Sequence, residues 1–144
     1  MLGVSLADYV NLVKLCVGVS SVEELAGWIA RRGGQTASHT TRMRPKREAE
    51  LLAGGSLYWV IKGAIQARQE VLGLEEVSGP DGKPHCRLVL SRDLIRTHNA
   101  PRRPFQGWRY LSAEDAPADL PKTRASEEPL PQELAQALAD IGLL

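Results

Sequence analysis

The sequence predicts a small α+β domain with a mixed β-sheet and two or three helices. Strand-like segments with alternating side chains lie at residues 11–19, 56–63 and 85–91. Helical patterns occupy the stretch between the first two strands. The turn sequence SGPDGKP, residues 78–84, joins the third strand to an extended segment before it, and this predicts a β-hairpin.

The first strand leads directly into the first helix. NLVKLCVGV, residues 11–19, is short and rich in β-branched residues, so we expect a mostly buried strand. In SSVEELAGWIARRGG, residues 20–34, Ser20 and Glu23 have the spacing of a capping box, and a glycine pair ends the helix. Apolar residues at helical spacing predict the face that this helix buries.

A loop and a shorter helix are expected next. QTASHTTRMR, residues 35–44, is polar and resembles a loop in composition. PKREAELLAGG, residues 45–55, predicts a helix because Pro45 suits the first helical position and two glycines follow the apolar residues.

Residues 56–91 predict the centre of the sheet. SLYWVIKG, residues 56–63, consists of good strand formers in alternation, so it is predicted to be a central strand. Residues 66–77 are predicted to be a strand with a bulge or bend at Gly73, while a helical face over residues 64–72 is the alternative. The hairpin turn then leads into the strand at 85–91.

The last third of the chain has weaker patterns. An irregular segment with two prolines is expected to end in a short strand at 108–111. We expect one domain over residues 1–120, followed in 121–144 by an acidic, proline-rich linker and an amphipathic helix. That helix is expected to dock on the domain or to support homo-oligomerisation.

Composition excludes several classes of protein. Apolar residues make up 43% and charged residues 24%, and no apolar run reaches the roughly 18–20 residues of a membrane span, so we expect a soluble protein without a membrane partner. The first residues lack the pattern of a secretory signal, and a cytoplasmic location is therefore expected. Cys16 and Cys86 are far apart in sequence, which favours reduced thiols over a disulfide framework.

No motif indicates a cofactor or a metal. The three histidines and two cysteines have no paired spacing on a helix, as zinc ligands would. The nucleophile motif GxSxG and the phosphate-loop motifs GxxxxGK[ST] and GxGxxG do not occur. We therefore expect no metal and no cofactor, and we assign no catalytic residue.

Charge is unevenly distributed along the chain. The net charge is +1, yet residues 39–110 have a surplus of six positive charges and residues 111–144 a surplus of five negative charges. The segment TTRMRPKRE, residues 40–48, places cations before a predicted helix N-terminus, where an anionic ligand would be favoured. The alternatives are a polyanion site and solvated charges of both signs that face each other.

Polar residues also follow the predicted central strand. Gln66, Arg68 and Glu70 would share one face of the next strand, close to Lys62. Burying such groups without partners costs several kcal/mol, so this face is either exposed to solvent or forms a polar pocket. In a pocket Glu70 is a candidate general acid or base, and a salt bridge is its alternative role.

The segment APRRPFQGWRYL, residues 100–111, holds three of the seven aromatic residues. Truncating a buried aromatic costs about 3–5 kcal/mol, whereas stacking on a base contributes about 1–3 kcal/mol, so Phe105 and Tyr110 are expected in the core. For Trp108 both positions, in the core and on the surface, are consistent with the sequence. Arg102 and Arg103 lie between two prolines, which suits either contact with phosphate or pairing with the acidic tail.

Two resemblances extend these patterns. VKLCVGVSSVEELAGW, TRMRPKREAELLAGGSLYWVIKGAIQARQEVLGLEEV and APRRPFQGWRYLSAEDAPADL resemble an uncharacterised, mainly alphaproteobacterial family, the domain of unknown function fourteen eighty-nine. The order of elements also resembles the PUA and ASCH domains, which implies a small, mixed, barrel-like sheet that binds RNA or modified bases. Some ASCH-like members hydrolyse acylated cytidines with a lysine, a threonine and a glutamate. Lys62, Thr41 and Glu70 are residues of these types, but the local motif does not match, so the resemblance assigns them no catalytic role.

We predict that the domain binds RNA or a nucleotide-like ligand through a basic surface. One alternative is a small hydrolase or transferase for a nucleoside-like substrate, with Lys62 and Glu70 in a pocket. The other is a protein-interaction module that uses the C-terminal helix. The residues predicted to bind nucleic acid are Arg42, Arg44, Lys46, Arg47, Lys62, Arg68, Arg102, Arg103, Trp108 and Arg109.

Overall fold

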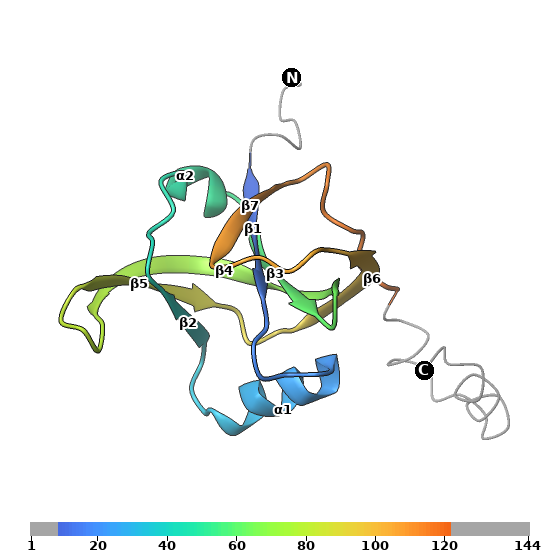
Figure 1. The fold of residues 1–144 in the computed structure, drawn as a ribbon, viewed down its shortest axis with the longest axis horizontal. Coiled ribbons are helices and arrows are strands. Elements are labelled where there is room, and N and C mark those ends of the chain that lie inside the picture. Colours follow the sequence, from blue (N-terminus) through green and yellow to red (C-terminus); the bar gives the residue numbers. More distant parts are fainter. Residues whose placement is uncertain (1–8, 122–144) are drawn as a thin grey trace, which may run out of the picture.

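The structure is a computed structural model that describes residues 9–121 (Figure 1). The elements in chain order are β1 (Val10–Leu15), α1 (Val22–Arg31), β2 (Ala37–Thr41), α2 (Glu48–Leu51), β3 (Ser56–Ile61), β4 (Ala64–Ser78), β5 (Pro84–Leu90), β6 (Ile95–Pro101) and β7 (Trp108–Ser112). Within residues 9–121 no helix has the length and apolarity needed to cross a bilayer.

The strands form one mixed sheet. Its order is β2-β5-β4-β3-β1-β7, and β6 pairs with β4 beside this path. β1 and β3 are parallel, and the other pairs are antiparallel. The predicted small α+β class and the mixed sheet are confirmed, and the order is an open path from β2 to β7 over the described residues.

The long strand β4 connects the two parts of the sheet. Its first half pairs with β3 and β6, and its second half pairs with β5 in the predicted hairpin. The register shifts between Val71 and Gly73, which confirms an irregularity at Gly73, and again between Ile65 and Ala67. Residues 64–72 are therefore strand rather than helix.

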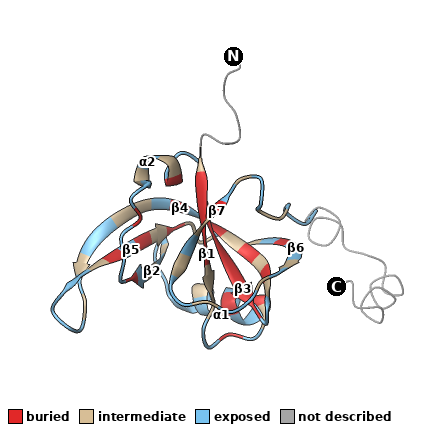
Figure 2. Ribbon diagram, turned by 45° about the horizontal axis from the view of Figure 1, so that its top comes forward, coloured by how far each residue is buried: buried red, intermediate tan, exposed pale blue. Residues whose placement is uncertain are grey.

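Both faces of the sheet around β1 and β3 are covered, so all six residues of β3 are buried (Figure 2). One face contributes to the larger core, which contains Leu12, Leu57 and Trp59. The other face carries a smaller core that includes Val13 and Tyr58. Because side chains alternate along a strand, neighbouring residues of β3 belong to different cores.

Helix α1 covers part of the larger core. Its buried residues are Val22 and Leu25. The predicted capping box is displaced by one residue, because the Ser21 side chain accepts the Glu24 backbone N–H at 3.0 Å. The Glu24 carboxylate in turn accepts the backbone N–H of Ser20 at 2.8 Å. The first bond satisfies an N–H group that the start of a helix leaves free, and the second fixes the residue before the cap.

Two segments that were expected to be irregular contain the strands β2 and β6. β2 lies within residues 35–44, where Ala37, His39 and Thr41 face inward, and among the described strands it pairs with β5 alone. β6 occupies residues 95–101 and pairs with β4. Both strands were missed because polar side chains on their exposed faces hide the pattern of a strand. Their backbone hydrogen bonds come from pairing with distant segments, which local sequence does not indicate.

The remaining helical prediction was partly right. α2 is a single turn, Glu48–Leu51, which starts after Arg47 rather than at Pro45, and Leu51 is its buried residue. The strand predicted at 108–111 is confirmed as β7. The linker and helix expected within 121–144 lie almost wholly outside the described residues.

Candidate functional site

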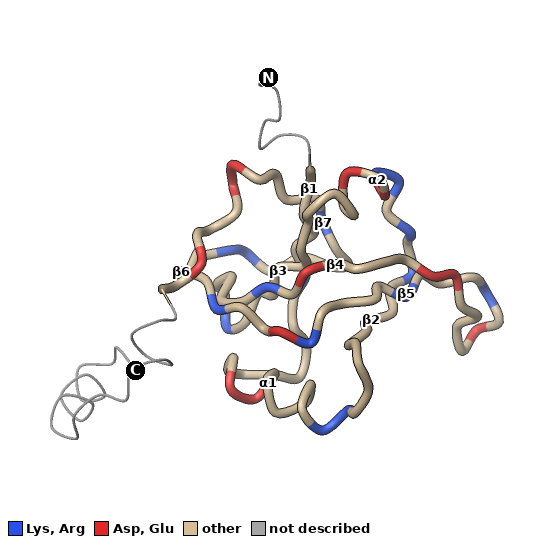
Figure 3. Tube along the Cα trace, turned by 180° about the vertical axis from the view of Figure 1, so that it is seen from behind, with Lys and Arg blue, Asp and Glu red and all other residues tan. Residues whose placement is uncertain are grey.

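The basic residues of the predicted nucleic-acid surface do not form one patch. Figure 3 shows Lys and Arg at separate places along the trace, with Asp and Glu between them. Around α2, Arg44 bonds Glu48 at 2.8 Å and Arg47 pairs with Glu50. Arg42 reaches Asp81 of the hairpin turn at 3.5 Å. Three of the predicted cations, Arg42, Arg44 and Arg47, therefore have carboxylate partners from the chain itself.

Arg68 is half-buried, and its guanidinium is held by partners from the chain itself. Its guanidinium donates to both oxygens of Asp119 at 2.8 Å and to the Ser56 hydroxyl at 2.8 Å. The polar face predicted around this strand therefore exists, and Arg68 has a carboxylate partner on it.

A second group of predicted cations has no ion pair among the described residues. Lys62 lies in the two-residue turn between β3 and β4, and the backbone N–H of Arg102 donates to the Gly63 carbonyl beside it at 2.8 Å. Arg103 follows Arg102 and is exposed. Arg109 lies on β7 with its guanidinium 5.5 Å from the Phe105 ring centre.

The aromatic residues of β7 hold the basic loop that follows β2. The Trp108 indole N–H donates to the Met43 carbonyl at 2.9 Å. The Tyr110 hydroxyl accepts the backbone N–H groups of Lys46 and Arg47 at 2.9 and 3.1 Å. Trp108 and Tyr110 are half-buried against the larger core, and their rings meet edge to face. Trp108 therefore points inward and has a structural role.

Lys62 and Glu70 do not share a pocket. Glu70 pairs with Ser56 at one end of β3, whereas Lys62 follows Ile61 at the other end. The six-residue spacing along a strand separates their backbones by about 20 Å. An acid–base pair must reach a common proton, so the enzyme hypothesis loses its proposed residues.

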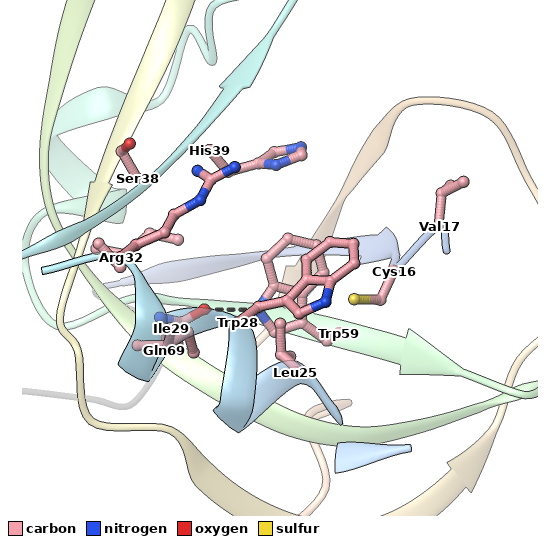
Figure 4. A pocket seen from close by; sticks show the side chains of 12 residues that line it. Cys16, Val17, Leu25, Trp28, Ile29, Arg32, Ser38, His39, Trp59 and Gln69 are labelled. Atoms are coloured by element: carbon pink, nitrogen blue, oxygen red, sulfur yellow. Dashed lines mark hydrogen bonds between the residues drawn. The ribbon is translucent and has the colours of Figure 1, made fainter. Parts of the chain in front are cut away.

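A different pocket lies between α1 and the sheet (Figure 4). Its volume is about 140 Å³. Three consecutive parts of the chain, the end of β1, helix α1 and strand β2, meet there over residues of β3 and β4. The lining residues are Cys16, Val17, Leu25, Trp28, Ile29, Arg32, Ala37, Ser38, His39, Trp59, Gln69 and Leu90. We call it the aromatic pocket.

The floor of the aromatic pocket is fixed by hydrogen bonds. The Trp59 indole N–H donates to the Gln69 side-chain oxygen at 2.8 Å, and the Gln69 amide donates to the Ser91 carbonyl at 2.8 Å. Trp59 and Gln69 are 5% and 1% exposed. Because these buried polar groups are paired, the Trp59 ring is held in one orientation.

His39 contributes the unpaired polar group of the pocket. Its ring meets Trp59 edge to face, with 5.3 Å between the ring centres. Its Nε2 is buried without a hydrogen-bond partner in the described part of the chain. Burial and, to a smaller extent, the positive charges of Lys14 and Arg32 lower the pKa of His39 to about 4. His39 is therefore neutral at physiological pH, and it is a residue of the pocket lining whose buried ring nitrogen has no partner among the described residues.

The rim of the pocket combines an exposed ring with positive charge. Trp28 of α1 is 40% exposed. Arg32 follows the end of the same helix.

Burial raises the pKa of the Cys16 thiol to about 11, with the Glu24 charge as a smaller cause. Cys16 is thus a protonated thiol that contributes shape rather than nucleophilic chemistry.

Within the described range, no three His, Cys, Asp or Glu side chains come together as metal ligands would. His39 and Cys16 both line the aromatic pocket, but two ligands fall short of the three that a catalytic zinc site takes from the protein.

Sequence reasoning missed the aromatic pocket because its residues are spread over separate elements. His39 stood out only as a metal ligand, and Trp59 only as a strand former. The available signal was Trp28, a large aromatic residue beside the apolar stripe of an otherwise polar helix.

Comparisons with known proteins give one match. A family model described as "Protein of unknown function (DUF1489)" matches residues 12–144. No curated protein and no solved structure matches the chain.

Proposed function

Because the chain belongs to the DUF1489 family, whose description assigns no activity, we propose a function from the pocket: the protein binds the base of a nucleotide or of single-stranded RNA. The observation that carries this proposal is the aromatic pocket, in which Trp28, Trp59 and His39 surround a space with one unpaired ring nitrogen.

The size of the pocket supports a single flat ring. An apolar cavity of about 150 Å³ in a protein core accommodates one benzene molecule. The aromatic pocket, at about 140 Å³, is of the same order and is open at its rim. Aromatic side chains offer a stacking surface to any base, and this contact contributes about 1–3 kcal/mol per base.

The polar groups favour a base over a plain hydrocarbon ring. A neutral imidazole has one nitrogen that donates and one that accepts, and base edges carry both kinds of partner. A ligand that bonds Nε2 of His39 would remove the penalty of an unpaired buried nitrogen. Arg32 at the rim supplies a positive charge for a phosphate.

Two further considerations point the same way. The resemblance to PUA and ASCH domains, which commonly bind RNA or modified bases, is an analogy of fold and carries no residue assignment. Lys62, Arg102, Arg103 and Arg109 form no ion pair with other described residues, so they are available to a longer strand of RNA.

The test is a calorimetric titration at low salt with uridine monophosphate, adenosine monophosphate and a short oligouridylate. Trp28→Ala should weaken binding by about 5- to 150-fold, the range of one lost stacking contact. Leu52→Ala is the matched control, because Leu52 is 39% exposed and does not line the aromatic pocket. Equal affinity of Trp28→Ala and the wild-type protein, or no binding of any probe, would refute the proposal.

Salt dependence separates RNA from a free nucleotide. If RNA is the ligand, replacing both Arg102 and Arg103 by alanine should reduce the slope of log affinity against log salt by about 2. If a nucleotide is the ligand, the mononucleotides should bind as tightly as the oligonucleotide and the double variant should behave as wild type.

A further inference from the structure

A second pocket lies on the opposite face of the sheet. Its volume is about 270 Å³, and its polar lining includes Asn11, Ser56, Tyr58, Arg68 and Asp119. Tyr58 of β3 and Arg68 of β4 are paired across the two strands. They directly precede Trp59 and Gln69, which belong to the aromatic pocket. Because strand side chains alternate, the two pockets share a sheet but not a face. We call this space the polar pocket.

Asn11 carries an unsatisfied donor at the polar pocket. It is 1% exposed, and its side-chain oxygen accepts the Ser56 backbone N–H at 2.9 Å. That bond fixes the orientation of the amide, since only the oxygen can accept. Its Nδ2 group has no partner among residues 9–121. A buried amide donor without a partner is costly, so an acceptor oxygen is expected at this position when the pocket is filled.

Arg68 already shows which chemical group suits the pocket. Its guanidinium holds the Asp119 carboxylate through two parallel bonds of 2.8 Å. This two-bond geometry is the one by which arginine recognises carboxylates and phosphates in general. The Arg68 side chain is 22% exposed and that of Asp119 is 43% exposed, so Asp119 forms the outer wall of the pocket.

Asp119 belongs to a segment without regular structure. The segment is held to β6 by an isolated bridge between Thr97 and Asp119 and by backbone bonds from His98 to Ala118 and from Leu120 to Arg96, each 2.9 Å. A side chain on such a segment can leave Arg68 without loss of the sheet.

Tyr58 supplies a further donor. It lines the polar pocket, and burial raises the pKa of its hydroxyl above the ordinary value. The hydroxyl therefore keeps its proton at neutral pH and can donate it to an oxygen.

We propose that the polar pocket binds a small oxyanion, a carboxylate or a phosphate group, which accepts from Asn11 and Tyr58 and replaces Asp119 on Arg68. The Arg68 guanidinium keeps one anionic partner in this exchange, while the displaced Asp119 carboxylate turns into solvent. Asp119 is then a built-in competitor that keeps the site closed at low ligand concentration.

The experiment is a nuclear magnetic resonance titration of the full chain with inorganic phosphate and, separately, with acetate. The Asn11 side-chain amide is the reporter. Asp119→Asn removes the competing carboxylate, so the affinity for the preferred anion should rise at least about tenfold. Asp115→Asn is the matched control, since Asp115 lies on the same segment and forms no ion pair with another described residue. The two titrations show whether the site prefers a carboxylate or a phosphate.

A second variant tests the donor directly. Asn11→Asp keeps the oxygen that bonds Ser56 and replaces the Nδ2 donor by an acceptor, so anion binding should be lost, with the Ser56 backbone amide resonance as the reporter in place of the missing side-chain amide. If that variant does not fold, Tyr58→Phe in the Asp119→Asn background should weaken binding instead. The proposal fails if neither anion moves the Asn11 amide resonances of Asp119→Asn, or if Asp115→Asn gains the same affinity.

Discussion

The two faces of the sheet differ in how their polar groups are satisfied. On the face of the aromatic pocket, Trp59 and Gln69 bond to each other and to the backbone. On the face of the polar pocket, Arg68 depends on Asp119 from a distant segment. Adjacent residues of the same strands thus build one site with a fixed floor and another whose wall is a single exchangeable side chain. The alternation of side chains along a strand is the cause.

The covers of the two faces also differ. Helix α1 closes the first face with an intact cap and buried side chains at Val22 and Leu25. Residues 113–119 close the second face through a few backbone bonds and the pair between Arg68 and Asp119. We therefore expect stability to depend mainly on the first face and ligand exchange to be easier at the second.

The largest effect should come from the floor of the aromatic pocket. Trp59→Ala should lower the free energy of unfolding by about 3–5 kcal/mol, because it removes a buried ring and leaves the Gln69 oxygen unpaired. Tyr58→Phe, its neighbour on the other face, should change that free energy by less than about 1.5 kcal/mol. Urea unfolding of the two variants measures the contrast, and equal losses would show that the faces contribute alike.

An intermediate effect should appear as a pH dependence from His39. Its folded pKa of about 4 lies below the unfolded value of 6.5, so the unfolded chain binds more protons between these limits. The free energy of unfolding should therefore fall as pH decreases from about 6.5 to about 4, by at most about 3 kcal/mol. His39→Gln should flatten this part of the profile. Urea unfolding across that pH range is the measurement, and an unchanged slope in the variant would assign the dependence to other groups.

The smallest effect should come from the ion pair on the polar face. Asp119→Asn should cost about 1 kcal/mol or less, since the Asp119 side chain is 43% exposed and water screens the pair. Hydrogen bonding to Arg68 lowers the pKa of Asp119, so this contribution is present above the ordinary carboxyl pKa and is lost as pH falls below it. Thermal unfolding of Asp119→Asn at neutral pH checks it, and a loss as large as that of Trp59→Ala would mean that the segment is an integral part of the core.

Local signals in the sequence predicted local structure well. The glycine and proline turn between β4 and β5 and the serine and glutamate cap of α1 each depend on residues a few positions apart, and both were predicted within a residue or two. β2 and β6 were missed because their evidence is the partner strand, which lies tens of residues away. Short polar segments become strands when a distant edge accepts their hydrogen bonds.

The difference between local and distant contacts also explains which parts of the candidate site the sequence could predict. Clusters of arginine are visible in a sequence, but the carboxylates that neutralise them are not: Asp81 for Arg42 and Asp119 for Arg68 come from distant segments. The aromatic pocket joins Trp28, His39 and Trp59, which share no pattern along the chain. The question left open at Trp108 is decided by its bond to the Met43 carbonyl, a contact that no local pattern predicts.

The position of β1 has a consequence for synthesis of the chain. β1 is the first strand of the described range, yet its two neighbours are β3 and β7, and Val10 pairs with Ser112. A ribosome that makes the protein from its N-terminus must therefore release nearly the whole domain before the second edge of β1 finds its partner. Until then an apolar strand has unpaired backbone groups, which invites association between nascent chains. Such distant pairing also slows folding, so we expect the refolding rate, rather than equilibrium stability, to be the property most sensitive to changes in β7.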